Sequence, residues 1–96
     1  MMAGATTISE TSVPHLPRGV RLKFDKPREQ WVILAPERMF VLDEISLAII
    51  KCCDGTATVS TVTDDLAAQF EAPRDAILND VITLLQDLAD KGVVAA

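Results

Sequence analysis

The sequence contains few of the residues from which catalytic and metal sites are built. It has one histidine, His15, and two cysteines, Cys52 and Cys53, which are adjacent in the chain. These residues do not follow the ligand spacing of zinc sites. The four glycines are isolated, so no glycine-rich phosphate-binding loop is present. Because no nucleophile or acid–base pair with an orienting partner stands out either, we expect a protein without catalytic activity, bound metal or cofactor.

Long hydrophobic runs are also absent. No apolar stretch approaches the roughly 20 residues that a membrane-spanning helix needs. The first 12 residues have neither a basic start nor a continuous apolar segment, so they do not resemble a signal peptide. The flanks of Cys52 and Cys53 indicate a helix, in which reduced cysteines act as small apolar side chains. We therefore expect a cytoplasmic protein with reduced cysteines.

The chain has fewer basic than acidic residues. The chain has 9 basic and 14 acidic residues, for a formal net charge of −5. An acidic surface repels phosphate backbones and anionic lipids, so nucleic acid and membrane surfaces are not expected as partners. Apolar residues make up 49% of the 96 residues and charged residues 24%, which is typical of one folded globular domain.

The pattern along the chain divides it into a tail and a domain. Residues 1–16 have no hydrophobic period and end among prolines, so they predict a flexible tail before a domain over residues 17–96. Three short segments with strand composition follow, at residues 18–24, 30–35 and 38–42. The connections between them are so short that we expect an antiparallel meander.

The hydrophobic period then changes to that of helices. Asp43 is a candidate N-cap for a helix over residues 44–53, and Thr58 or Ser60 for a second helix that runs to about Phe70. A third helix is expected from about residue 73 to 90, with Gly92 as its stop. The predicted fold class is α+β, a three-stranded antiparallel sheet followed by three helices, which is the plan of a winged helix-turn-helix.

The third predicted helix has an unusually wide apolar sector. At 100° per residue its apolar side chains span about 160°, whereas an ordinary surface helix needs a stripe of about 100°. The whole sector could be core, or one side of it could line a groove for a partner. The third strand is last in the meander and therefore a predicted edge, to which an extended peptide can add.

Two other classes of function remain as alternatives. A DNA-binding winged helix is disfavoured, because a recognition helix presents basic and amide side chains to the bases. The third helix instead carries four acidic residues and has only Arg74 and Lys91 as basic residues at its ends. A structural or dimerising adaptor is the second alternative, since an exposed edge strand can also pair with its own copy. We therefore expect a monomer or a weak homodimer.

A series of short motifs, in order along the chain, resembles the PqqD family. The resemblance covers about residues 14–94, and Cys52-Cys53 replaces the more usual aliphatic residues. The motifs are Arg18-Gly19-Val20-Arg21-Leu22, Trp31-Val32-Ile33-Leu34-Ala35-Pro36-Glu37-Arg38, Leu42, Asp54-Gly55, Leu66-Ala67, Phe70-Glu71-Ala72-Pro73, Asp80-Val81, Leu84-Leu85, Leu88 and Lys91-Gly92.

The resemblance implies a function that the composition does not show. PqqD proteins are peptide chaperones in the biosynthesis of pyrroloquinoline quinone (PQQ). They bind the precursor peptide PqqA and present it to PqqE, a radical SAM enzyme that crosslinks a Glu and a Tyr side chain of the peptide. Their fold is the leader-peptide recognition element, in which the peptide adds beside the third strand and lies against the third helix. The family is sometimes fused to a neighbouring pathway enzyme.

The resemblance also implies which residues meet the peptide. By position, the strand contacts fall on Arg38, Met39, Phe40, Val41 and Leu42, and the helix contacts on Ile77, Asp80, Val81, Leu84, Leu85 and Leu88. Some of these side chains must belong to the core, with Phe40 and Leu42 the first candidates. Trp31 is a further candidate, either as a contact for the partner enzyme or as part of the core.

Overall fold

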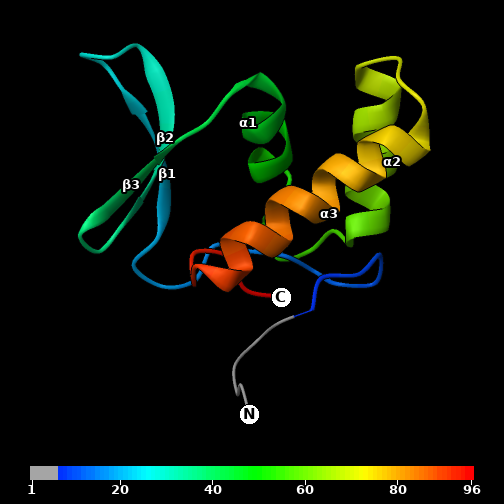
Figure 1. The fold of residues 1–96 in the computed structure, drawn as a ribbon, viewed down its shortest axis with the longest axis horizontal. Coiled ribbons are helices and arrows are strands. Elements are labelled where there is room, and N and C mark those ends of the chain that lie inside the picture. Colours follow the sequence, from blue (N-terminus) through cyan, green and yellow to red (C-terminus); the bar gives the residue numbers. More distant parts are fainter. Residues whose placement is uncertain (1–6) are drawn as a thin grey trace.

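Three strands form one antiparallel sheet in the order β1-β2-β3, so β1 and β3 are its edges. The computed structural model describes residues 7–96 (Figure 1). β1 spans Arg21–Asp25, β2 Gln30–Ala35 and β3 Arg38–Val41. A two-residue turn joins β2 to β3, and Glu37 has a φ of 61° in it. The predicted meander is confirmed.

Three helices follow the sheet, and their ends have clear local causes. α1 spans Glu44–Lys51, α2 Val59–Gln69 and α3 Arg74–Asp90. The side chains of Asp43 and Thr58 cap α1 and α2 by accepting hydrogen bonds from backbone N–H groups of the first turn. Gly92, at a φ of 80°, ends α3, and Val93 N donates back to Leu88 O at 2.9 Å in the usual glycine-ended motif. The predicted α+β fold class is correct.

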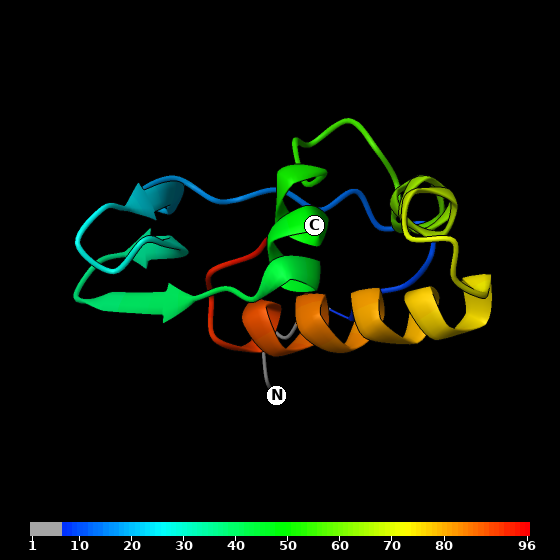
Figure 2. The same cartoon turned by 90° about the horizontal axis from the view of Figure 1, so that it is seen from above.

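The sheet lies at one end of the molecule and the helices at the other, with α1 between the sheet and α2 (Figure 2). β3 and α3 lie on the same side of the molecule in this view. One apolar core joins the inner face of the sheet to all three helices. From the sheet region and the helices it includes Ile33 and Leu42, Ile49 and Ile50 of α1, Val59, Val62 and Leu66 of α2, and Ile77, Val81, Leu85 and Leu88 of α3.

The N-terminal segment differs from the predicted flexible tail. We call residues 8–15 the N-terminal strap, because they run across the helices and join the C-terminal segment. Ile8 is only 5% exposed and belongs to the core. His15 exchanges two backbone hydrogen bonds with Ala95, at 2.8 and 2.9 Å. These contacts are non-local and leave no period in the sequence, so the sequence does not predict them. The part of the predicted tail over residues 1–6 lies outside the described residues.

Candidate functional site

The outer edge of β3 carries backbone groups that the sheet does not use. Leu42 N donates to Trp31 O at 3.0 Å, which makes this a hydrogen-bonded pair of the β2–β3 ladder. Hydrogen-bonded and non-bonded pairs alternate in antiparallel sheets, so Phe40 also faces β2 with its backbone groups. The N–H and C=O groups of Met39 and Val41 therefore point to the open edge. Such an edge is able to accept one more strand.

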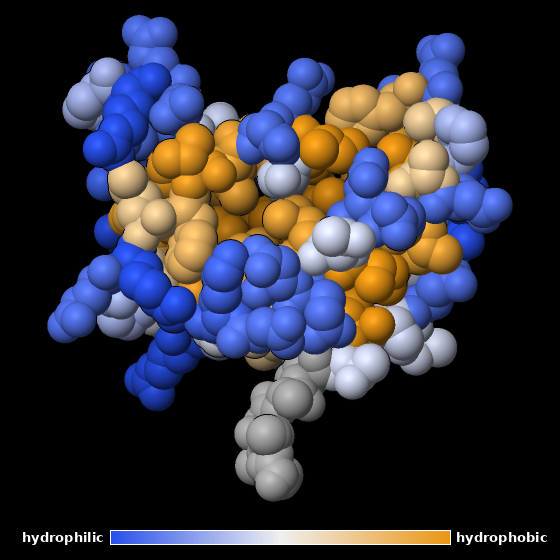
Figure 3. Space-filling model, in the orientation of Figure 1, coloured by the Kyte–Doolittle hydropathy of each residue, from blue (hydrophilic) through white to orange (hydrophobic). Residues whose placement is uncertain are grey.

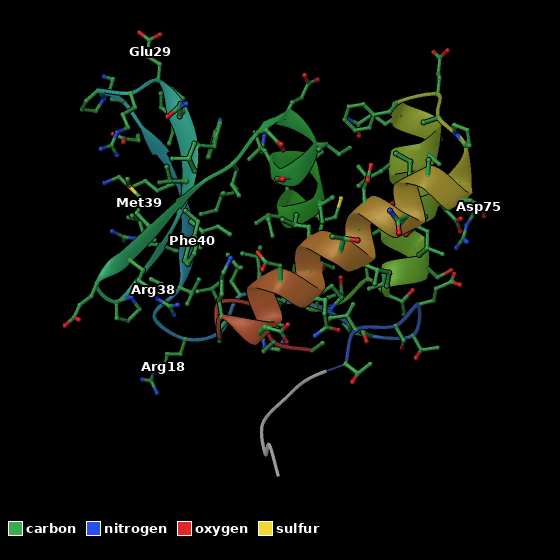
Figure 4. All side chains as sticks on the ribbon, viewed as in Figure 1. Arg18, Glu29, Arg38, Met39, Phe40 and Asp75 are labelled. Atoms are coloured by element: carbon green, nitrogen blue, oxygen red, sulfur yellow. The ribbon has the colours of Figure 1, made fainter. Side chains whose placement is uncertain are left out.

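The side chains of β3 point alternately to the helices and away from them. Leu42 is buried in the core, whereas Phe40 is half-buried and packs at its border. The expectation that both are core residues therefore holds fully for Leu42 and in part for Phe40. Met39 points away from the helices (Figure 4). Met39 and Val41 remain 40% and 52% exposed.

Cations connect the beginning of β3 to the end of α3. The Arg38 guanidinium lies 5.5 Å and the Lys91 ammonium 5.9 Å from the centre of the Phe40 ring. Arg38 Nη2 also donates to Lys91 O at 2.8 Å. Lys91 Nζ forms an ion pair with Asp87 Oδ2 at 2.8 Å. These contacts hold β3 beside α3 and place two cations at this end of the site, one of them paired with Asp87.

A cleft of about 480 Å³ lies between α1 and α3. Figure 3 shows apolar residues in the hollow between the sheet and the helices, with hydrophilic residues around its rim. An apolar floor with a polar rim is the usual character of a site that binds a peptide side chain. The residues that line the cleft are Ile45, Ser46, Ile49, Asn79, Asp80, Thr83, Leu84 and Asp87.

The structure divides the predicted α3 residues into two groups. Asp80 and Leu84 line the cleft. The other four are core residues, each no more than 4% exposed, and they do not line the cleft: Ile77, Val81, Leu85 and Leu88. Direct contact by these four is therefore not supported.

Sequence reasoning did not assign the α1 side of the cleft, formed by Ile45, Ser46 and Ile49. Ile45 and Ile49 are spaced by four residues, which indicates a buried face of α1 but does not show that part of that face is open.

Trp31 lies apart from this cleft. Its ring packs edge-on against Phe24 at a centroid distance of 5.5 Å, and the Lys51 ammonium lies 5.0 Å from its centre. Trp31 is half-buried, and Trp31 and Phe24 both lie outside the core cluster. Trp31 therefore belongs to a separate aromatic contact at the border of the sheet and α1.

The cysteines are poorly suited to nucleophilic chemistry. Burial raises the pKa of the Cys53 thiol to about 12, and its Sγ donates to Ile49 O at 3.2 Å. Burial also raises the pKa of Cys52, helped by the nearby carboxylates of Asp65 and Asp54. Few thiolates form near neutral pH at such values. Among residues 7–96, no cluster of three or more His, Cys, Asp or Glu side chains has the arrangement of a metal site.

Comparison with known proteins identifies the family. The sequence model of the family described as "Coenzyme PQQ synthesis protein D (PqqD)" matches residues 30–94, which include β2, β3 and all three helices. The chain belongs to the PqqD family. The resemblance found in the sequence motifs is thereby confirmed.

Curated PqqD relatives are similar over most of the chain. A PqqA binding protein of Bradyrhizobium diazoefficiens is 56% identical over 86 residues, which cover 90% of this chain and 84% of the relative. The bifunctional coenzyme PQQ synthesis protein C/D of Methylorubrum extorquens is 44% identical over 92 residues. That match covers 96% of this chain but 25% of the relative, so there the PqqD sequence is one part of a longer protein.

Solved PqqD structures have the same fold. The solution NMR structure of the PqqD truncation of Methylobacterium extorquens PqqCD matches with a TM-score of 0.83 and 41% identity, over 99% of this chain and 100% of that one. It is described as a functional, stand-alone recognition element for ribosomally synthesised and post-translationally modified peptides. The crystal structure of PqqD from Xanthomonas campestris matches with a TM-score of 0.60 and 43% identity, over 94% and 100% of the two chains.

Proposed function

We propose that this chain is a non-catalytic peptide chaperone in PQQ biosynthesis, which binds the precursor peptide PqqA and presents it to the radical SAM enzyme PqqE. One observation carries the proposal: β3, whose outer edge is open, is held beside α3, and α3 forms with α1 a cleft with an apolar floor. Relatives that are named PqqA binding proteins support the choice of peptide. We place the recognition unit in residues 17–96, braced by the N-terminal strap.

PqqA would bind as a fourth strand beside β3. The N–H and C=O groups of Met39 and Val41 would pair with the peptide backbone. Alternate side chains of the peptide would then point toward Phe40 and the cleft, where Leu84 and Ile45 offer apolar contact. Arg38 and Lys91 at one end of the site and Asp80 in the cleft would favour one register of a charged peptide.

Backbone pairing alone would give only weak binding. A hydrogen bond contributes about 0.5–1.5 kcal/mol net, because both partners leave water to form it. The cost of ordering an extended peptide offsets much of this contribution. Apolar side chains that enter the cleft must therefore supply most of the affinity, and the backbone contacts fix the direction of the peptide.

Two further features of the proposal concern assembly and location. The same edge of β3 can pair with a second copy, so we propose a monomer or a weak homodimer whose formation competes with peptide binding. A ribosomally made peptide is available in the cytoplasm, where the two free cysteines would stay reduced, and we place the activity there. None of the helices within residues 7–96 combines the length and apolar composition needed to cross a membrane.

Titration of the isotope-labelled chain with PqqA tests the binding site. Amide signals of residues 38–42 and 80–84 should shift. Val41→Pro removes one N–H of the open edge, and a proline is tolerated where that group faces solvent. We expect it to weaken binding about 3–10-fold relative to Val41→Ala, which keeps the N–H, since one hydrogen bond is lost. Shifts confined to other surfaces, or equal affinity of the two variants, would contradict the site.

Presentation to PqqE has a separate test. The rate at which PqqE crosslinks PqqA is measured with and without the chain, at peptide concentrations where the chain is saturated. We expect crosslinking to require the chain or to be strongly accelerated by it. Equal rates would contradict presentation and leave PqqA binding intact.

A further inference from the structure

The face of the sheet that points away from the helices has a regular chemical pattern. Strand register places two rows of side chains across this outer face, Arg21–Leu34–Met39 and Lys23–Val32–Val41. In each row the β1 residue is basic and the β2 and β3 residues are apolar. Val32, on the central strand of this face, is 1% exposed and lies outside the core cluster. We call these six residues the outer face.

Charge is separated between the sheet and the rest of the molecule. Residues 18–41 contain six basic and three acidic side chains, a net charge of +3. All other residues together contain three basic and eleven acidic side chains, a net charge of −8. The outer face itself carries two cations and no carboxylate. It is therefore a basic, partly apolar surface on an otherwise acidic chain.

The apolar part of the outer face is open to solvent along β3. Met39 and Val41 are two of the three exposed large apolar residues among the described residues 7–96. Arg28, from the turn after β1, touches this surface, with its Nη1 atom 3.5 Å from Met39 Sδ. An exposed apolar strip with cations around it is typical of a surface that meets another protein.

Peptide binding would enlarge this same surface. If PqqA adds beside β3, every second side chain of the peptide points to the outer side, next to Met39 and Val41. A protein that docks on the outer face would then contact the chaperone and the exposed side chains of the peptide together. This step rests on the proposed function, since it needs the peptide at the edge of β3.

We infer that the outer face is the docking surface for the peptide-modifying enzyme, and that it binds an acidic patch of that enzyme next to the presented peptide. Charge complementarity selects the occupant, because Arg21 and Lys23 attract carboxylates and repel a second basic sheet. A second copy of the chain would bring a sheet region with a net charge of +3 over residues 18–41, in which basic side chains outnumber carboxylates. Trp31 lies on the opposite face of the sheet, packed with Phe24 and Lys51, and is the competing surface for the enzyme.

A pair of charge-reversal variants tests the inference with PqqE as the probe. Arg21→Glu/Lys23→Glu reverses the charge of the outer face. Arg18→Glu/Lys51→Glu is the matched control, because it changes the net charge equally at exposed positions outside that face and includes the cation next to Trp31. Binding of PqqE to the chain saturated with PqqA is measured at low and high salt, and PqqA affinity is measured for each variant alone.

We expect the outer-face variant to bind PqqE at least tenfold more weakly at low salt, while the control stays within about threefold of the wild type. PqqE binding by the wild type should weaken as salt rises, because salt screens exposed charges. Unchanged PqqA affinity of both variants would show that the fold and the peptide site are intact. If the outer-face variant is poorly folded, Arg21→Gln/Lys23→Gln replaces it, with a smaller loss in the same direction.

The outcomes separate this inference from the proposed function. Loss of PqqE binding by the outer-face variant alone supports the docking surface. Equal PqqE binding by the wild type and the outer-face variant overturns it, as does a larger loss in the control, which would favour the side of Trp31. A wild-type chain that binds PqqA but not PqqE overturns the docking surface and presentation. A wild-type chain that does not bind PqqA overturns the proposed function itself.

Discussion

Leu84 and Leu85 are neighbours on α3 that the structure assigns to different surroundings. Leu85 is fully buried in the core, whereas Leu84 is half-buried and lines the cleft. The two residues therefore separate binding from folding within one helix. The wide apolar sector of α3 contains both, and the pattern of the sequence does not distinguish them.

Replacement of Leu85 by alanine should mainly affect folding, whereas replacement of Leu84 should mainly affect peptide binding. Leu85→Ala should lower the free energy of unfolding by about 2–5 kcal/mol, because it opens a cavity in the core. Leu84→Ala should lower stability less but weaken PqqA binding about 5–30-fold, since part of the apolar contact is lost. Urea unfolding and calorimetric titration of both variants measure these effects. If folded Leu85→Ala protein binds PqqA more weakly than Leu84→Ala protein does, the assignment of Leu84 to binding and Leu85 to folding is wrong.

We predict that ionisation of the Cys53 thiol lowers the free energy of unfolding at high pH. Its pKa is raised to about 12 by burial, above the ordinary value of 9.0. The folded state therefore favours the protonated thiol. This contribution is complete below pH 9 and is lost as the pH rises from 9 toward 12. Urea unfolding of the wild type should show stability declining over that range, and Cys53→Ala should decline less. Equal slopes would show that other groups cause the decline.

At the scale of elements, the N-terminal strap completes the start of α2. Val59 N donates to Ser12 O at 2.8 Å, and Ser60 N donates to Glu10 O at 2.9 Å. These are among the first N–H groups of α2, which have no partner within the helix. Arg74 at the start of α3 forms ion pairs with Glu10 at 2.9 Å and with Asp64 of α2 at 2.6 Å. The strap therefore joins the beginnings of two helices.

Deletion of residues 1–12 should destabilise the domain, although residues 7–12 contain no helix or strand. Loss of Ile8 from the core and of two backbone acceptors should lower the free energy of unfolding by about 2–4 kcal/mol. For a domain of this size that corresponds to a fall in Tm of at least about 10 °C. Deletion of residues 1–6 is the matched control, because it keeps all of these contacts. Circular dichroism melts of both variants measure the difference, and equal Tm values would refute the role of the strap.

The strap also shows which parts of the fold a sequence can predict. The helices and the meander leave local signals, such as the Asp43 and Thr58 caps and the glycine after α3, and those elements were predicted with ends within about three residues. Residues 8–15 are held by backbone groups far away in the chain, which no local pattern reveals. The open side of the cleft was also missed in part, because Ile45 and Ile49 have the same spacing whether α1 is covered or not.

At the scale of the whole molecule, the charge separation governs how two copies can meet. An antiparallel pairing of two β3 edges is a two-fold contact, so each copy brings the same residues to it. Both sheets carry a net charge of +3 over residues 18–41. Like charges oppose this pairing, whereas they do not oppose a peptide of suitable charge at the same edge.

We therefore predict a monomer at micromolar concentration and a weak dimer near millimolar concentration. Added salt should strengthen the dimer, because it screens the repulsion between the two sheets. Saturating PqqA should dissociate the dimer, because the peptide and the second copy both need the edge of β3. Sedimentation velocity over a concentration series, with and without PqqA, measures both effects. Val41→Pro should weaken the dimer relative to Val41→Ala for the same reason that it weakens peptide binding. A dimer that persists with saturating PqqA must use another surface, and one that weakens with salt would show that attraction between charges holds it together.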